Sequence, residues 1–181
     1  MTLRLARLTK LMVEYYRGDC GRIKHFLNVH QLAATIGRLE NIEEFSMDVL
    51  EAAAIVHEAG ISLCREESGS SDSRLTVRKG SAEARMLLKR TGGFTDEETD
   101  RITHLVEVHR SFTAVEGIDH QILTEAIILD EIDKGLYPGT GIAELSRLYF
   151  RTKTGRELLD AMHGGKPWTM APQDDKNPSC C

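Results

Sequence analysis

The sequence predicts an all-α fold, a helical bundle in one domain that spans residues 1–164. Apolar residues recur at three- and four-residue spacing along nearly the whole chain, as they do on the buried face of a helix. Capping sequences precede several of these repeats. With 181 residues, of which 41% are hydrophobic, the chain is long enough for one domain with a sizeable core. A bundle is the architecture that this pattern supports best.

Three helices are expected in the first sixty residues. The first covers residues 3–15 and ends near Gly18, since glycine favours a helix end. Asp19 is a suitable N-cap for the second, whose apolar residues continue to about residue 34. The sequence Asn41-Ile42-Glu43-Glu44 has the form of a capping box before the third helix, and Gly60 ends that helix.

The second half begins with a polar stretch and then returns to helices. Residues 65–80 contain S-G-S-S-D-S and little apolar periodicity, so we expect a long exposed loop. A fourth helix is expected over residues 81–90, and a fifth after the capping box at residues 95–98. The sixth begins near Asp119, and two shorter helices follow, the last of them capped at residues 154–157.

Composition narrows the classes of protein. The net charge of -5 argues against a nucleic-acid polymer as partner, and no apolar stretch approaches the roughly 20 residues that cross a bilayer. The four cysteines show no Cys-x-x-Cys spacing, so we expect a reduced, cytoplasmic protein. Residues 165–181 are polar and proline-containing, which predicts a flexible tail that ends in Cys180 and Cys181. Lipidation of that cysteine pair and a homodimer both stay open.

Histidines and carboxylates recur at inward positions of successive helices. They are His25, the adjacent pair His57 and Glu58, His109, and Asp130, each on or beside an apolar helical face. Facing helices of a bundle build metal sites from such side chains. Imidazole together with carboxylate suits a divalent ion such as Mn, Fe, Mg, Zn or Ni.

Each of these residues also has an ordinary structural interpretation. A histidine on an apolar face is most often a core or boundary residue, and His30, His104 and His120 are interpreted in that way. Glu58 is by default a solvated carboxylate, and Asp130 belongs to the charged run D-E-I-D-K, which is typical of an exposed face.

The order of four motifs resembles the HD superfamily of metal-dependent phosphohydrolases. They read R-I-K-H-F-L, I-V-H-E-A-G, L-V-E-V-H-R and L-T-E-A-I-I-L-D. The resemblance covers about residues 14–160 and implies a helical core around a divalent metal. It implies that His25 and His57 are metal ligands, that Glu58 replaces the aspartate of the His-Asp pair, and that a phosphate ester, commonly a nucleotide, is the substrate.

The chain departs from the pattern of this superfamily at three positions. Glu58 carries one methylene more than aspartate, Arg110 stands where relatives often have a histidine, and Ile127 stands where a late aspartate ligand is expected. Asp130, one turn further on, is the nearest substitute ligand. Arginine binds phosphate rather than metal, so Arg110 is a candidate for substrate binding.

Three functions are compatible with these sequence features. In the first, His25, His57, Glu58 and Asp130 hold one ion for hydrolysis of a small phosphate ester. Catalysis then involves Glu58 and His109, which orients or protonates, and phosphate is gripped by Arg110 or by Arg74, Arg78 and Lys79. In the second, the chain is a catalytically inactive scaffold that binds a phosphate-bearing ligand or a protein, with or without an ion. In the third, it is a structural helical domain whose histidines are core residues.

Overall fold

The computed structural model describes residues 1–60, 73–112 and 114–165, with the main chain alone at residues 73–78. Over these ranges the protein is all-helical and contains no strand, which confirms the predicted fold class. The helices, in chain order, are α1 (Leu3–Tyr15), α2 (Cys20–Leu39), α3 (Glu44–Val56), α5 (Ser73–Thr91), α6 (Asp96–Val108), α7 (Ile118–Asp133), α8 (Ile142–Tyr149) and α9 (Lys153–His163).

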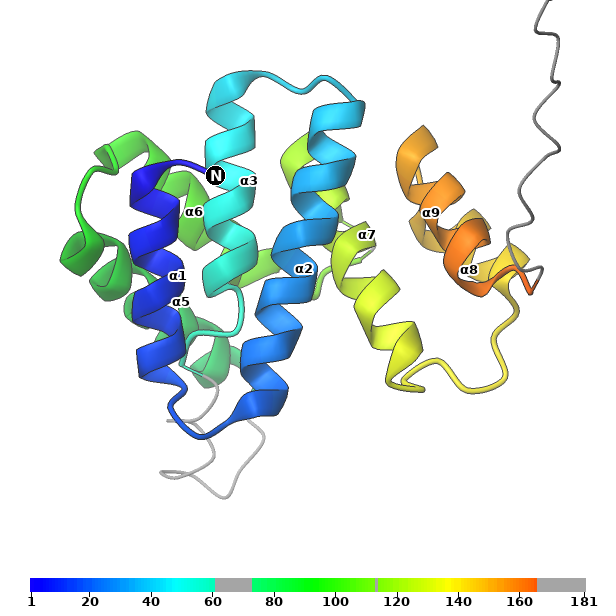
Figure 1. Ribbon diagram of the computed structural model, residues 1–181, viewed down its shortest axis with the longest axis horizontal. Helices are drawn as coiled ribbons and strands as arrows, with labels where there is room; N and C mark the ends of the chain where they lie inside the picture. Colours follow the sequence, from blue (N-terminus) through cyan, green and yellow to red (C-terminus); the bar gives the residue numbers. More distant parts are fainter. Residues whose placement is uncertain (61–72, 113, 166–181) are drawn as a thin grey trace, which may run out of the picture.

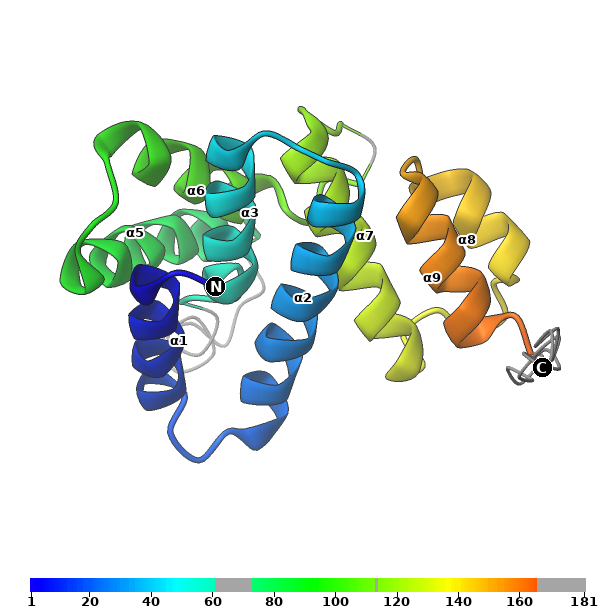
Figure 2. The same ribbon diagram turned by 45° about the horizontal axis from the view of Figure 1, so that its top comes forward.

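Helices α2, α3 and α7 form the centre of the bundle. Helix α7 is buried without interruption from Asp119 to Glu131, and α3 is buried from Val49 to its C-terminus. Helices α1, α5 and α6 pack on one side, and α8 and α9 form a hairpin on the other (Figure 1). Figure 2 shows the same arrangement from a second direction. Among the described residues, no helix combines the length and the apolar character that a bilayer crossing requires.

Of the four expected N-terminal caps, two are confirmed and two are wrong. Thr95 forms the expected capping box with Glu98, and Asp19 caps α2 by accepting from the backbone N–H of Arg22. Residues 41–44 form no capping box, because Asn41 takes a left-handed φ of 54° and α3 begins only at Glu44. The N-cap of the last helix is Thr152, two residues before the expected cap at Thr154.

The expected loop at residues 65–80 is wrong over its second half, where α5 already begins at Ser73. Gly80 lies inside this helix and marks a close approach rather than a break. A Cβ at Gly60 would lie 2.9 Å from the Cα of Gly80, and a Cβ at Gly80 would lie 3.0 Å from the carbonyl oxygen of Ala59. The two glycines therefore let α5 pack against the end of α3. Residues 65–72 and the predicted tail at 166–181 lie outside the described residues.

A fully buried carboxylate fastens the C-terminal hairpin to α7. The side chain of Glu125 accepts hydrogen bonds from the backbone N–H groups of Arg151 (2.6 Å) and Thr152 (2.9 Å), from Gln121 (2.7 Å) and from the Thr152 hydroxyl. A Cβ at residue 155 would lie 2.0 Å from the Glu125 carboxylate, so Gly155 is required there. We call this set of contacts the Glu125 latch.

Candidate metal centre

Three potential ligand atoms converge where the C-terminus of α3 meets the N-terminal half of α2. The Nε2 atoms of His25 and His57 lie 3.0 Å apart, and His25 Nε2 lies 3.7 Å from Glu58 Oε1. All three ligand atoms fall within 4.8 Å of one another, so the group could hold a metal ion. We call His25, His57 and Glu58 the donor group. The sequence predicted all three as ligands.

His57 is fixed by its position at the end of α3. It is the C-cap residue, and its Nδ1–H donates to the carbonyl oxygen of Ala54 at 2.8 Å. Burial, reinforced by the nearby charge of His25, lowers the pKa of His57 to about 3. The ring is therefore neutral at neutral pH, and its Nε2 lone pair points at His25.

His25 is oriented from the opposite side by Asp130. Its Nδ1 lies 2.5 Å from Asp130 Oδ2 and 2.7 Å from Lys134 Nζ. Because an ionised carboxylate can only accept, the short contact with Asp130 places the ring proton on Nδ1, and the Lys134 ammonium donates to the same carboxylate oxygen at 2.6 Å. Burial alone would raise the pKa of Asp130, but hydrogen bonds from His25, Lys134 and Asn28 outweigh it and hold that pKa well below its usual range. Asp130 is thus an ionised acceptor that fixes the His25 proton on Nδ1, as carboxylates do behind metal-binding histidines.

The donor group fits a divalent ion. With both Nδ1 atoms protonated, two Nε2 lone pairs face each other across 3.0 Å and repel unless a cation, either a proton or a metal ion, is shared between them. Two imidazoles on a tetrahedral ion with bonds of about 2.0–2.1 Å hold their nitrogens about 3.3 Å apart. The observed spacing therefore needs only a small opening.

Asp130 and Ile127 do not complete the donor group. The sequence offered Asp130 as a substitute ligand, but its carboxylate lies on the Nδ1 side of His25, away from Nε2. Ile127 is fully buried in the apolar core. Asp130 follows Ile127 by three residues on α7, and successive helix residues are rotated by about 100° about the axis. The Asp130 side chain therefore meets His25 at Nδ1 and does not take the place of the ligand expected at position 127.

Glu58 reaches the two histidines and also lies against two arginines. Its carboxylate oxygens are 3.6 Å from Arg22 Nη1 and 3.9 Å from Arg110 Nη2. His25, Arg22 and Arg110 all lie near the Glu58 carboxylate but beyond hydrogen-bond distance from it. The longer side chain of glutamate is compatible with this wide arrangement.

His109 lies next to the donor group without belonging to it. Its ring packs edge-on against His57, with 5.5 Å between ring centroids, and its Nδ1–H donates to Val106. Its buried Nε2 has no hydrogen-bond partner among the described residues. Burial lowers the pKa of His109 to about 3. At neutral pH it therefore offers a lone pair and no second proton, which favours an orienting role over the expected role as a proton donor.

A hollow of about 330 Å³ opens beside the donor group and carries three cations. Sequence reasoning proposed one of them, Arg110, and missed Arg22 and Lys134. Both have a sequence signal, because Arg22 precedes His25 by three residues and Lys134 follows Asp130 by four, so each shares a helix face with its neighbour. We call these three residues the rim cations. The hollow is also lined by His25, Glu58, Glu131, Gly21 and Leu136.

The other expected phosphate-binding residues are not placed at this hollow. Lys79 is half-buried, has interaction partners of its own and does not line the hollow. The side chains of Arg74 and Arg78 lie outside the described residues. Their assignment therefore stays a prediction from the sequence.

The remaining predicted structural histidines do have partners. His30 pairs with the buried Glu51 at 2.9 Å, and His104 pairs with Glu116 at 2.7 Å. His120 lies 3.1 Å from the carbonyl oxygen of Val108. None of the three lies in the donor group.

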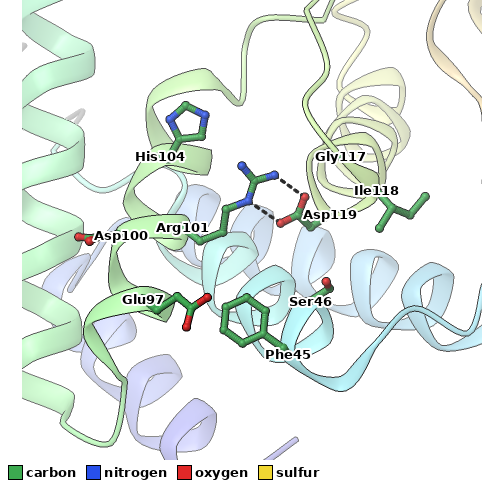
Figure 3. A pocket seen from close by; sticks show the side chains of 9 residues that line it. All are labelled: Phe45, Ser46, Glu97, Asp100, Arg101, His104, Gly117, Ile118 and Asp119. Atoms are coloured by element: carbon green, nitrogen blue, oxygen red, sulfur yellow. Dashed lines mark hydrogen bonds and ion pairs between the residues drawn. The ribbon is translucent and has the colours of Figure 1, made fainter.

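A larger hollow of about 520 Å³ lies between α3, α6 and the start of α7 (Figure 3). Several of its polar groups are engaged in hydrogen bonds. Arg101 and Asp119 point toward each other and form two hydrogen bonds of 2.7 and 2.8 Å, while His104 is held by Glu116. Among the described residues, the group that could hold a metal ion lies at the smaller hollow, so we place the candidate site there.

Comparisons of the chain with protein-family models, with curated proteins and with solved structures found no match.

Proposed function

We propose that the protein hydrolyses a small phosphate ester with a divalent metal ion bound by the donor group. The observation that carries this proposal is the convergence of two imidazole nitrogens and a carboxylate at the edge of a hollow that also holds the rim cations. Metal ligands and phosphate-binding groups are the two components that such a reaction needs. The order of the motifs, which resembles that of the HD superfamily, supports the same reaction class and suggests a nucleotide or a related small molecule.

The chain's own residues have distinct roles in this proposal. His25, His57 and Glu58 hold the ion, and Asp130 keeps His25 in the tautomer that presents Nε2. Arg22, Arg110 and Lys134 bind the phosphate oxygens and orient the ester. A divalent ion in such a site lowers the pKa of a bound water and polarises a phosphoryl oxygen. The neutral His109 orients the His57 ring by packing against it.

A second function is favoured by one specific observation. Ile127 is buried in the core at the position where the resemblance expects a ligand, so the donor group has three members. A chain with this group could bind phosphate esters, with or without an ion, and release no product. The two functions share the hollow and differ in turnover.

Phosphate release from p-nitrophenyl phosphate and from nucleoside monophosphates distinguishes them. The purified chain is stripped with chelator, reloaded with Mn²⁺, and compared with His57→Ala and with the control His104→Ala, which removes a histidine from outside the donor group. The proposal expects release that needs the ion, falls at least 100-fold in His57→Ala and persists in His104→Ala. Binding of these esters without release of phosphate, unaffected by chelator, would support the second function and contradict the first.

A further inference from the structure

The guanidinium of Arg110 spans two carboxylates at the mouth of the hollow. Its Nη2 lies 3.9 Å from Glu58 Oε1, and its Nη1 lies 3.4 Å from Glu131 Oε1. The Arg110 side chain is 55% exposed. Neither contact has the geometry of a strong, bidentate arginine–carboxylate pair. Arg110 is therefore held weakly and has room to change its rotamer.

Arg22, the other arginine beside Glu58, is held much more firmly. Its side chain is 14% exposed, its Nε contacts Asp19 at 3.1 Å, and its guanidinium lies 5.6 Å from the ring centre of Tyr16. Of the two guanidinium groups at Glu58, one is thus fixed and one is adjustable.

Arg110 and a divalent ion would compete for the same carboxylate. The ion needs the negative charge of Glu58, and a guanidinium 3.9 Å away both uses part of that charge and repels a second cation. While Arg110 stays beside Glu58, metal binding is weakened.

A phosphate in the hollow offers Arg110 a better partner. Tetrahedral oxyanions accept two parallel hydrogen bonds from a guanidinium, which neither Glu58 nor Glu131 provides in the observed arrangement. Glu131 does not lose its only partner when Arg110 leaves, because Tyr137 donates its hydroxyl proton to Glu131 Oε2 at 3.0 Å. The movement therefore leaves one carboxylate satisfied and frees the other for the ion.

We propose that Arg110 couples the two binding steps: it weakens metal binding by occupying Glu58, and a bound phosphate group draws it away and so tightens metal binding. This coupling rests on the proposed function, since it needs an ion at the donor group. By linkage, the ion must tighten oxyanion binding by the same factor. With this coupling, the ion would bind tightly only when a phosphate-bearing substrate is present.

Calorimetric titration of the full chain with Mn²⁺ tests the coupling. Each titration is run in chloride and in sulfate at equal ionic strength, because sulfate is a tetrahedral dianion that stays soluble with Mn²⁺. For the wild-type chain, sulfate is expected to tighten Mn²⁺ binding at least about fivefold. In Arg110→Ala, Mn²⁺ binding in chloride is expected to tighten about two- to fivefold, and the effect of sulfate to fall toward none.

Arg147→Ala, which removes an exposed arginine at the end of α8, is the matched control and should behave as the wild type. If wild-type chain binds Mn²⁺ and Arg110→Ala keeps the full effect of sulfate, the coupling is overturned while the metal site stands. If wild-type chain binds no Mn²⁺ in either salt, the proposed function fails and the coupling fails with it.

Discussion

Two of the buried carboxylates of helix α7, Glu125 and Asp130, have different tasks. Glu125 is fully buried and its partners are backbone N–H groups, an amide and a hydroxyl, none of which changes charge. Asp130 is 4% exposed and its partners are His25, Asn28 and Lys134, next to a solvent-accessible hollow. Burial of a carboxylate therefore does not by itself mark a site. The charge of its partners and their access to solvent separate the Glu125 latch from the metal centre.

The largest expected effect is on the latch. Replacement Glu125→Ala leaves the N–H groups of Arg151 and Thr152 buried without acceptors, which should lower the free energy of unfolding by about 3 kcal/mol or more. Chemical denaturation measures this loss. A loss of unfolding free energy as small as that of an exposed substitution would mean that α8 and α9 are held by apolar contacts alone. It would also contradict the structural role assigned to Glu125.

A smaller effect is expected when the charge behind His25 is removed. Asp130→Asn should weaken Mn²⁺ binding about 10- to 100-fold, because His25 loses the ionised acceptor that fixes its tautomer. The isosteric change Glu125→Gln, at the carboxylate of the Glu125 latch, should leave the Mn²⁺ affinity of the folded chain unchanged. Equal losses of affinity in both variants would show that the two carboxylates act through the fold and not through His25.

Acid should destabilise the fold through the buried, neutral ring of His109. The folded pKa of His109 is about 3, below its ordinary value of 6.5, so above pH 6.5 neither the folded nor the unfolded chain protonates this group. As pH falls from 6.5 toward 3, the unfolded chain binds the proton first, and stability falls by about 1.4 kcal/mol per pH unit for this residue.

His109→Asn should remove that share of the pH dependence. Unfolding free energies at pH 7, 6 and 5 give the two slopes, and the variant is expected to lose less stability than the wild type over this interval. His57 has the same direction of shift and remains in both proteins, so the difference between the slopes reports His109. Identical slopes would contradict the buried, neutral state of this ring.

The smallest effect is expected at an exposed carboxylate near the latch. Glu157 pairs with Lys153 at 3.7 Å, and the two side chains are 64% and 84% exposed. Glu157→Ala should change the free energy of unfolding by less than about 0.5 kcal/mol in the same denaturation assay. A loss as large as that of Glu125→Ala would show that the assay reports helix α9 in general and not the latch.

Much of the fold follows from local patterns, and the exceptions have physical causes. Apolar periodicity places the helices, and the capping box at Thr95 marks the start of α6. The start of α5 was missed because residues 65–80 show little apolar periodicity, and the close contact between Gly60 and Gly80 forms only in the folded chain. Local sequence carries no information about which glycine faces which.

The same limit applies to the site. Inward spacing places His25, His57 and Asp130 on facing helices, and the structure brings them together. The partner of each His25 nitrogen depends on how α2 and α7 are rotated about their axes. The apolar periodicity of a helix predicts which face is buried, but it does not predict that rotation accurately enough to assign the partners. Arg22 and Lys134 could have been predicted from their one-turn spacing from His25 and Asp130. This signal becomes useful once a helix face is known to carry the site.

The position of a bound ion tests the central claim most directly. Crystals of the chain grown with Mn²⁺ and measured near the manganese absorption edge locate the ion by anomalous scattering. We expect one peak bonded to His25 Nε2, His57 Nε2 and Glu58 at about 2.0–2.3 Å, with Asp130 still on His25 Nδ1. A peak at Asp130 or in the larger hollow, or no peak in well-ordered crystals, would contradict the assignment of the donor group.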